Sequence, residues 1–206
     1  QLNEVLKECN TGNICLRNLN STFELPQSLK QKTADVTLFL EVERGVKNLE
    51  SFRTDQDFEE SETLLSSRYS YPTINGFVHR SPSTPLIFKE NFPSKCDLES
   101  GGKYFGNKCL HIIKIPLGSV TDIFMIDEGK DDLTSSFHLH GFRFYVLNEG
   151  RIKKKGDSET KITELLKKME SEEKLSKKLE FPVQKDTISV PQGGYTLIRF
   201  LADNPG

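Results

Sequence analysis

Hydrophobic and polar residues alternate most clearly between residues 34 and 42, where every second residue from Val36 to Val42 is apolar. Because successive side chains of a strand point to opposite faces, this pattern predicts a half-buried strand. A shorter strand is expected around Val46–Phe52. The residues before the first strand, 1–33, show no sustained periodicity, which predicts a linker leading into a domain.

Strand patterns become dense in the second half of the chain. Runs rich in β-branched and aromatic residues, separated by turn residues, predict five further strands. They span residues 110–117, 119–127, 137–147, 186–190 and 195–201. The sequence contains no internal repeat, so we expect a single all-β sandwich with long insertions.

One segment, from Glu159 to about Leu179, has the period of a helix. Its apolar residues recur at helical spacing between Ile162 and Met169, and Lys and Glu fill most other positions. We interpret it as an amphipathic helix packed on the rim of the sandwich, in an insertion of about residues 157–180. A calmodulin-binding or membrane-surface helix is the alternative, and the mixed charge argues against it.

Composition excludes some classes of partner. The 28 basic and 30 acidic residues give a formal charge of −2, which does not favour nucleic acid or an anionic membrane as a partner. No apolar run approaches the roughly 20 residues that span a bilayer, so no membrane span is expected. The first residues do not resemble a signal peptide, although a mature or internal fragment would also lack one.

Four cysteines form two local pairs, Cys9 with Cys15 and Cys96 with Cys109, in segments that have the composition of loops. Two short disulfides are the favoured interpretation. Zinc is the alternative, which no Cys-x-x-Cys spacing or nearby histidine cluster supports. The triplet Asn20–Thr22 is a glycosylation sequon. Together these features predict a secreted glycoprotein.

The candidate chemistry lies in the segment Phe137-His138-Leu139-His140-Gly141. Strand alternation places His138 and His140 on one face, where two imidazoles suit different ions of a metal cluster, and neutral imidazole is a favoured copper ligand. A pair of ordinary histidines on a polar face is the alternative. His79 and His111 match no motif and are interpreted as surface or strand residues.

These residues stand in a longer pattern. The run SSFHLHGFRFYVL resembles the motif His-Pro-x-His-x-His-Gly of the last cupredoxin domain of multicopper oxidases, from its phenylalanine onward. Residues 185–206 resemble the stretch that precedes the family's terminal His-Cys-His motif. The segment from Glu8 to Leu16 is similar to the link into the third domain of the insect laccase-like members. Several separated motifs therefore occur in the family's order.

The resemblance implies a Greek-key cupredoxin-type sandwich over residues 34–206, the third domain of such an oxidase. It implies copper as the cofactor, with His138 a ligand of the lone (type 2) copper and His140 a ligand of the coupled pair. In the family this cluster reduces dioxygen to water with electrons from a separate blue copper. Other cluster histidines come from an N-terminal domain, so the implied partners are N-terminal cupredoxin domains of the same protein or a companion chain.

Two features depart from the family pattern. Ser135 stands where the motif's first histidine binds the blue copper, and Ser136 replaces the proline that follows. A serine hydroxyl is a poor substitute for imidazole on copper. The chain also stops at Gly206, just before the expected His-Cys-His segment, so we expect the final strand and the thiolate ligand to be absent. The only site residues assigned are the metal ligands His138 and His140, and no catalytic residue is assigned.

Three hypotheses follow for function. The favoured one is a divergent laccase-like relative of the multicopper oxidases, with degraded copper sites and a non-catalytic binding or structural role. The alternative is a fragment of an active copper-dependent oxidase that takes electrons from phenols, ascorbate or ferrous iron. A structural or storage module without a ligand is the third. In the first two, the His138 and His140 rings should lie together, facing the interface with a partner domain, each oriented by an acceptor on its other nitrogen.

Overall fold

The computed structural model describes residues 15–47, 69–79, 108–109, 111–129, 135–152 and 160–204. The chain divides into two compact units, which are described separately below. The first consists of residues 1–42 and 113–206, and the second of residues 43–112. The predicted domain boundaries at residues 33 and 34 stay a prediction.

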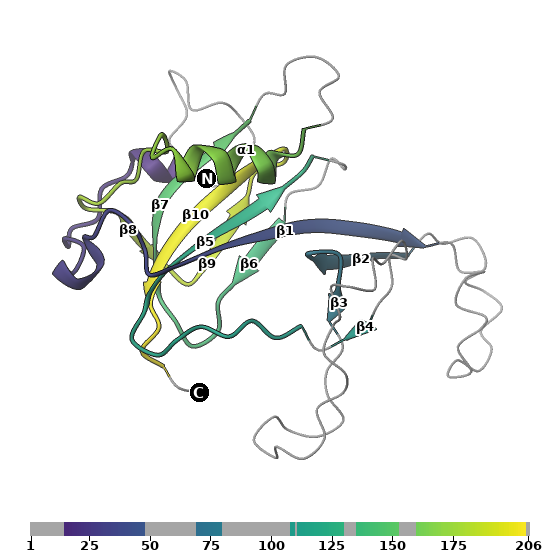
Figure 1. Ribbon diagram of the computed structural model, residues 1–206, viewed down its shortest axis with the longest axis horizontal. Helices are drawn as coiled ribbons and strands as arrows, with labels where there is room; N and C mark the ends of the chain where they lie inside the picture. Colours follow the sequence, from purple (N-terminus) through teal and green to yellow (C-terminus); the bar gives the residue numbers. More distant parts are fainter. Residues whose placement is uncertain are drawn as a thin grey trace. The chain divides into compact units, whose positions relative to one another are not determined.

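The first unit is organised around one large sheet (Figure 1). In spatial order its strands are β1 (Val36–Lys47), β5 (Val120–Asp127), β10 (Gly194–Leu201), β7 (Phe144–Arg151) and β8 (Val183–Lys185). β1 is parallel to β5, and the other neighbouring pairs are antiparallel. β5 is buried along its whole length, and β10 along all but its last residue. Strands covered on both faces tend to have continuous apolar runs, and residues 123–126 of β5 form such a run.

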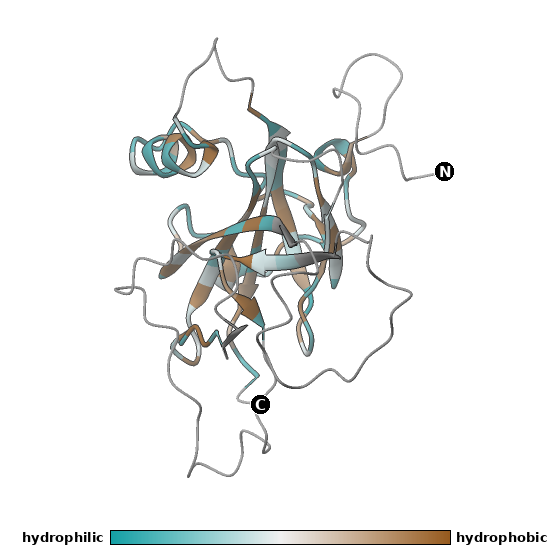
Figure 2. Cartoon of the chain, turned by 90° about the vertical axis from the view of Figure 1, so that its right-hand side faces the viewer, coloured by the Kyte–Doolittle hydropathy of each residue, from teal (hydrophilic) through white to brown (hydrophobic). Residues whose placement is uncertain are grey.

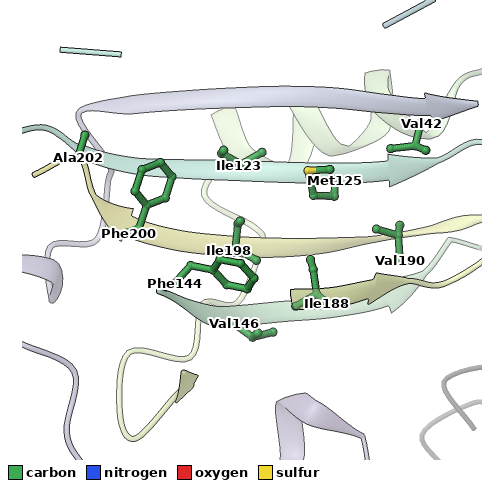
Figure 3. Packing of buried hydrophobic residues seen from close by; sticks show 10 residues of the cluster. All are labelled: Val42, Ile123, Met125, Phe144, Val146, Ile188, Val190, Ile198, Phe200 and Ala202. Carbon is green, nitrogen blue, oxygen red and sulfur yellow. The ribbon is translucent and has the colours of Figure 1, made fainter. Parts of the chain in front are cut away.

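A second, two-stranded sheet covers one face of this large sheet. It consists of β6 (Ser135–His138) and β9 (Thr187–Val190), which are antiparallel. Apolar side chains from β1, β5, β7, β9 and β10, and from the residue that follows β10, pack between the two layers (Figure 3). They are Val42, Ile123, Met125, Phe144, Val146, Ile188, Val190, Ile198, Phe200 and Ala202. The predicted all-β sandwich is confirmed.

The helix α1 (Ile162–Ser171) lies on the opposite face of the large sheet. Its buried Ile162 and Leu166 pack on Phe124, Leu147 and Leu197, and the ribbon shows alternating apolar and polar bands along its turns (Figure 2). The helix therefore covers the face of the sheet, and the prediction that it packs at the rim was wrong.

The ends of α1 are set by contacts that its periodicity does not reveal. The buried carboxylate of Glu128 accepts hydrogen bonds from the backbone N–H groups of Ile162 and Thr163, at 2.9 and 3.0 Å. These are among the unpaired donors at a helix N-terminus, where a negative charge is also favoured. The helix ends at Ser171, and Glu173 then adopts a φ of +52°. The predicted helix, to about Leu179, was therefore too long. Leu175 still reaches the same apolar cluster, but it does so from a non-helical segment.

Two predicted strands differ from the structure. The run 137–147 is split by a turn at Gly141 into β6 and β7, which belong to different sheets. The run 110–117 forms no strand over its described residues, and its apolar side chains at Ile112 and Leu117 are 51% and 70% exposed. An apolar run without a neighbouring strand to pair its backbone does not form a sheet.

The described part of the predicted linker packs onto the first unit. This part contains two short 3₁₀ helices, η1 (Leu16–Asn18) and η2 (Gln27–Leu29). The buried Leu25, between them, and Leu29, in η2, pack against Val120. Cys15 is disulfide-bonded, and no cysteine in the described ranges is free. Cys9 and Cys96 lie outside the described residues, so the predicted pairing stays a prediction.

The second unit holds the shorter strands. β2 (Tyr69–Ile74) lies beside the end of β1 that belongs to this unit, where the Thr73 hydroxyl donates to the Glu43 carbonyl at 3.2 Å. β3 (Val78–His79) and β4 (Lys108–Cys109) form a parallel pair. None of the helices in the described part of the chain has the length and apolarity to cross a bilayer.

Candidate metal centre

The two predicted ligands lie side by side at the end of β6. Along this strand half-buried and exposed residues alternate, so Phe137 packs on the core while His138 is exposed. Leu139 also packs on the core, and His140 is exposed beyond it. The ring centroids of His138 and His140 are 6.1 Å apart, with the ring planes inclined by 66°. The prediction that the two rings lie on a common side is confirmed.

The His138 ring is held by a contact that determines which of its nitrogens is free. Its Nδ1 lies 2.9 Å from the Asp186 carbonyl oxygen and 3.0 Å from the Thr187 hydroxyl, both on or beside β9. A carbonyl oxygen can only accept, so Nδ1 carries a proton, and in the neutral ring Nε2 then carries the lone pair. This is the arrangement in which metal-binding histidines are oriented by an acceptor on the second nitrogen. The expected acceptor thus exists for His138.

The turn after His140 depends on glycine. Gly141 adopts a φ of +82°, and a Cβ at this position would lie 2.9 Å from the Asn204 side-chain nitrogen. That same nitrogen donates to the Gly141 carbonyl at 3.2 Å. A residue with a side chain would therefore be strained here and would also push Asn204 away. Gly141 lies in the turn that follows β6 and allows Phe142 to turn back and pack on Phe200, with ring centroids 5.0 Å apart.

Ser135 begins β6 and pairs with Val190 of β9 in the smaller sheet. It is half-buried and lies three residues before His138, on the strand that carries the first candidate ligand. Within the described ranges, no group of three or more His, Cys, Asp or Glu side chains is placed to hold a metal ion. Among the described residues, the candidate metal site therefore consists of two ligands, His138 and His140.

The two remaining histidines belong to the second unit. His79 is exposed on β3. His111 is half-buried, its ring centroid lies 5.2 Å from that of Phe77, and burial lowers the pKa of His111.

A buried carboxylate that the sequence does not reveal lies on β7. Glu149 is 5% exposed, and its Oε1 accepts a hydrogen bond from the Arg17 backbone N–H at 3.3 Å. Its Oε2 is buried without a hydrogen-bond partner among the described residues. Burial raises the pKa of Glu149 above its usual 4.5, against the opposing effects of Arg17 and Leu16. Burial, assisted by the charge of Glu149, raises the pKa of Tyr195 to about 12.

Replacing Glu149 with Gln should stabilise the protein at neutral pH. A carboxyl group whose pKa is raised by folding favours the folded state below about pH 4.5, and this contribution is lost as the pH rises through the folded-state pKa. At pH 7 the substitution replaces a buried charge by a neutral amide of the same shape, which costs less to bury, so we expect a gain of about 1 kcal/mol in the free energy of unfolding. Urea unfolding of both proteins at pH 7 and at pH 4 measures this difference in the free energy of unfolding.

The gain at pH 7 should shrink toward zero at pH 4, where the wild-type carboxyl group is protonated in both states. Glu180→Gln, at an exposed position, is the matched control and should change neither curve. Equal stability of Glu149→Gln and the wild-type protein at pH 7 would contradict the assignment of Glu149 as a buried charge whose second carboxylate oxygen has no partner.

Comparisons with known proteins identify the family to which this chain is similar. Residues 79–206 match the family model of the multicopper oxidases. Laccase-22 of Oryza sativa subsp. japonica is 27% identical over 208 residues, which cover 93% of this chain and 32% of that protein. Laccase-10 of Arabidopsis thaliana is 31% identical over 152 residues, which cover 65% and 24%. These relatives are plant proteins, so the resemblance to the insect members stays a prediction.

Solved structures of multicopper oxidases are also similar to this chain. Fet3p, a multicopper oxidase that functions in iron import, has 20% sequence identity and a TM-score of 0.48, over 84% of this chain and 27% of Fet3p. The chain spans about a third or less of the length of the relatives it matches. Because the family model covers more than half of the sequence, this chain belongs to the multicopper oxidase family, as a cupredoxin domain of the laccase-like type.

Proposed function

We propose that this chain is a divergent multicopper oxidase domain that has lost its blue-copper site and serves a non-catalytic binding or structural role. The observation that carries the proposal is Ser135. It lies at the start of β6, at the motif position of a blue-copper imidazole. A serine hydroxyl is a neutral, hard oxygen donor, whereas copper in such sites selects imidazole and thiolate ligands.

The chemistry of His138 and His140 fits copper at the neighbouring position. Both rings are exposed, and the tautomer of His138 leaves Nε2 free to bind a metal ion. Neutral imidazole is the ligand form that copper binds. When bound, copper supplies one-electron redox chemistry toward dioxygen in this family. This chain's own residues would contribute two ligands and the Asp186 carbonyl that orients one of them.

Two ligands from this chain imply that others come from elsewhere. An exposed pair of imidazoles suits the surface where a second cupredoxin domain docks, from the same protein or from a companion chain. The short span of this chain, relative to the laccases it matches, supports such a partner. We further propose that the protein is secreted, which the disulfide at Cys15 supports.

Copper loading followed by visible spectroscopy tests the loss of the blue-copper site. We expect no intense thiolate-to-copper absorption in the red part of the spectrum, because Ser135 replaces an imidazole. The protein should be prepared both as the present 206 residues and with any natural flanking sequence. An intense red band in either preparation would overturn the proposal.

An active oxidase is the second candidate, and the retained pair of ring nitrogens at His138 and His140 favours it. In that case the preparation with its flanking sequence should consume dioxygen with a phenol, ascorbate or ferrous iron. Dioxygen consumption separates the two cases, and the Ser135→His variant, prepared with the same flanking sequence, tests whether Ser135 alone removes the blue-copper site. If a blue-copper site is merely incomplete at this position, the variant should gain the red absorption band, and the wild-type protein should lack it.

A further inference from the structure

We propose that Asn20 carries an N-linked glycan whose first sugars lie over a shallow hollow beside it. Asn20-Ser21-Thr22 is the only Asn-x-Ser/Thr triplet in the sequence. The structure places Asn20 in an exposed, irregular segment between η1 and η2. A glycan requires such a surface position, because it is bulky and hydrophilic.

The backbone is held firmly on both sides of Asn20. On one side the Lys178 ammonium donates to the carbonyl groups of Arg17 and Leu19. On the other side the Ser21 backbone N–H donates to the Phe181 carbonyl at 2.8 Å. In Figure 1 the N-terminal segment and the segment that follows α1 lie beside each other. These contacts fix the chain against the domain and leave the Asn20 side chain at the surface.

The hollow beside Asn20 suits the first sugars of a glycan. It has a volume of about 510 Å³ and is lined by Asn20, Lys177, Lys178, Leu179, Glu180 and Phe181. A pyranose ring presents C–H groups on one face and hydroxyl groups at its edge. Phe181, which is 38% exposed, offers an aromatic surface for the C–H face. Glu180, which is exposed, offers a carboxylate that can accept hydrogen bonds from the hydroxyls.

The modification is a group transfer from a polyprenyl pyrophosphate-linked oligosaccharide, which is the required co-reactant. The Asn20 amide nitrogen forms a bond to the anomeric carbon of the first sugar and loses one proton. The bond from that carbon to the pyrophosphate oxygen breaks, and the polyprenyl pyrophosphate leaves. The hydroxyl of Thr22 completes the triplet that the transferring enzyme recognises.

A separate observation supports the compartment in which this reaction occurs. Cys15, five residues before Asn20, is disulfide-bonded. Disulfides form in the oxidising lumen of the secretory pathway, where N-linked glycans are also attached. The inference does not depend on copper binding, so either proposal can fail without the other.

Secretion from a eukaryotic host, followed by mass spectrometry of the peptide that contains Asn20, tests the modification. Enzymatic removal of the glycan in ¹⁸O-labelled water should convert Asn20 to labelled aspartate. Asn20→Gln and Thr22→Ala should each lose the glycan. The matched control is Ser21→Ala, which keeps the Asn-x-Thr triplet and should keep the glycan. Secreted wild-type protein with an unmodified Asn20 would overturn the proposal.

The position of the sugars is tested by the rate of enzymatic glycan removal from the folded protein. If the first sugars pack over the hollow, Phe181→Ala should expose them and speed their removal several-fold. The rate after denaturation should be the same for both proteins. An unchanged rate in the folded Phe181→Ala protein would show that the glycan does not lie on this surface.

Discussion

Replacing Asp122 with Asn should lower the free energy of unfolding by about 3–5 kcal/mol, the usual cost of removing one partner of a buried ion pair. Asp122 of β5 and Arg199 of β10 are cross-strand partners, and the side chains of both are completely buried. Two nitrogens of the Arg199 guanidinium donate to the two Asp122 carboxylate oxygens, at 2.6 and 2.8 Å. The variant would leave this guanidinium buried without its counter-charge.

The same pair connects three parts of the first unit. The remaining terminal nitrogen of Arg199 donates to the backbone carbonyls of Leu29 and Gln31, which fixes the N-terminal segment on the sheet. On the helix side, Lys177 donates to Asp122 at 3.1 Å and also to Glu170 of α1. The loss of the Asp122 carboxylate therefore removes a negative charge from beside two buried cations, Arg199 and Lys177. For this reason we expect a loss of stability at the upper end of the range for a single substitution.

Urea unfolding followed by circular dichroism measures this effect. Lys30→Gln is the matched control, since it breaks the exposed Lys30–Glu24 pair, in which nitrogen and oxygen are 2.8 Å apart. Exposed pairs contribute about 0–1 kcal/mol. If Asp122→Asn fails to fold, the double variant Asp122→Leu with Arg199→Met should fold, because it removes both charges together. Equal losses for Asp122→Asn and Lys30→Gln would contradict the assignment.

Replacing both His138 and His140 with Ala should abolish copper binding at the end of β6. In the described ranges these are the only two imidazoles that lie side by side there, and no third ligand replaces them. Elemental analysis of the purified protein after copper loading and dialysis measures the bound copper. Thr187→Val removes only the hydroxyl group beside Nδ1 of His138 and should weaken copper binding by about tenfold, the lower end for such orienting contacts.

The control for copper binding is His79→Ala, which removes an exposed histidine from the second unit. It should leave the amount of bound copper unchanged. A double His138→Ala, His140→Ala variant that retains the wild-type amount would show that the copper is bound elsewhere. Circular dichroism should be unchanged in all variants, because both histidines are exposed and the core contacts come from Phe137 and Leu139.

The sequence by itself determined the central strands and the candidate ligands. The alternation before Val42 and the apolar runs of β5 and β10 reflect which faces are buried, and this pattern is local. The spacing within one short segment indicates the pair His138 and His140, and the resemblance to the family motif marks Ser135 and Gly141. The structure confirms that the two rings lie together.

Only the tertiary structure decided how the run 137–147 is divided between two sheets. Apolar residues alternate on both sides of Gly141, so periodicity alone predicts one strand. The turn arises from the φ of +82° at Gly141 and its contact with Asn204, which is distant in sequence. In the same way, Leu175 packs on the sheet without being helical, and the apolar run before Leu117 finds no partner strand.

The charged groups inside the first unit were also decided only by tertiary structure. Asp122, Glu149 and Arg199 carry charges, which ordinarily remain in water, so the local sequence does not indicate that they are buried. Each is buried because residues far away in sequence supply its partners: Arg199 for Asp122, the carbonyl of Leu29 for Arg199, and the backbone of Arg17 for Glu149. Local patterns record which faces of a strand are apolar, but a buried charge depends on long-range contacts, and only the folded chain brings these together.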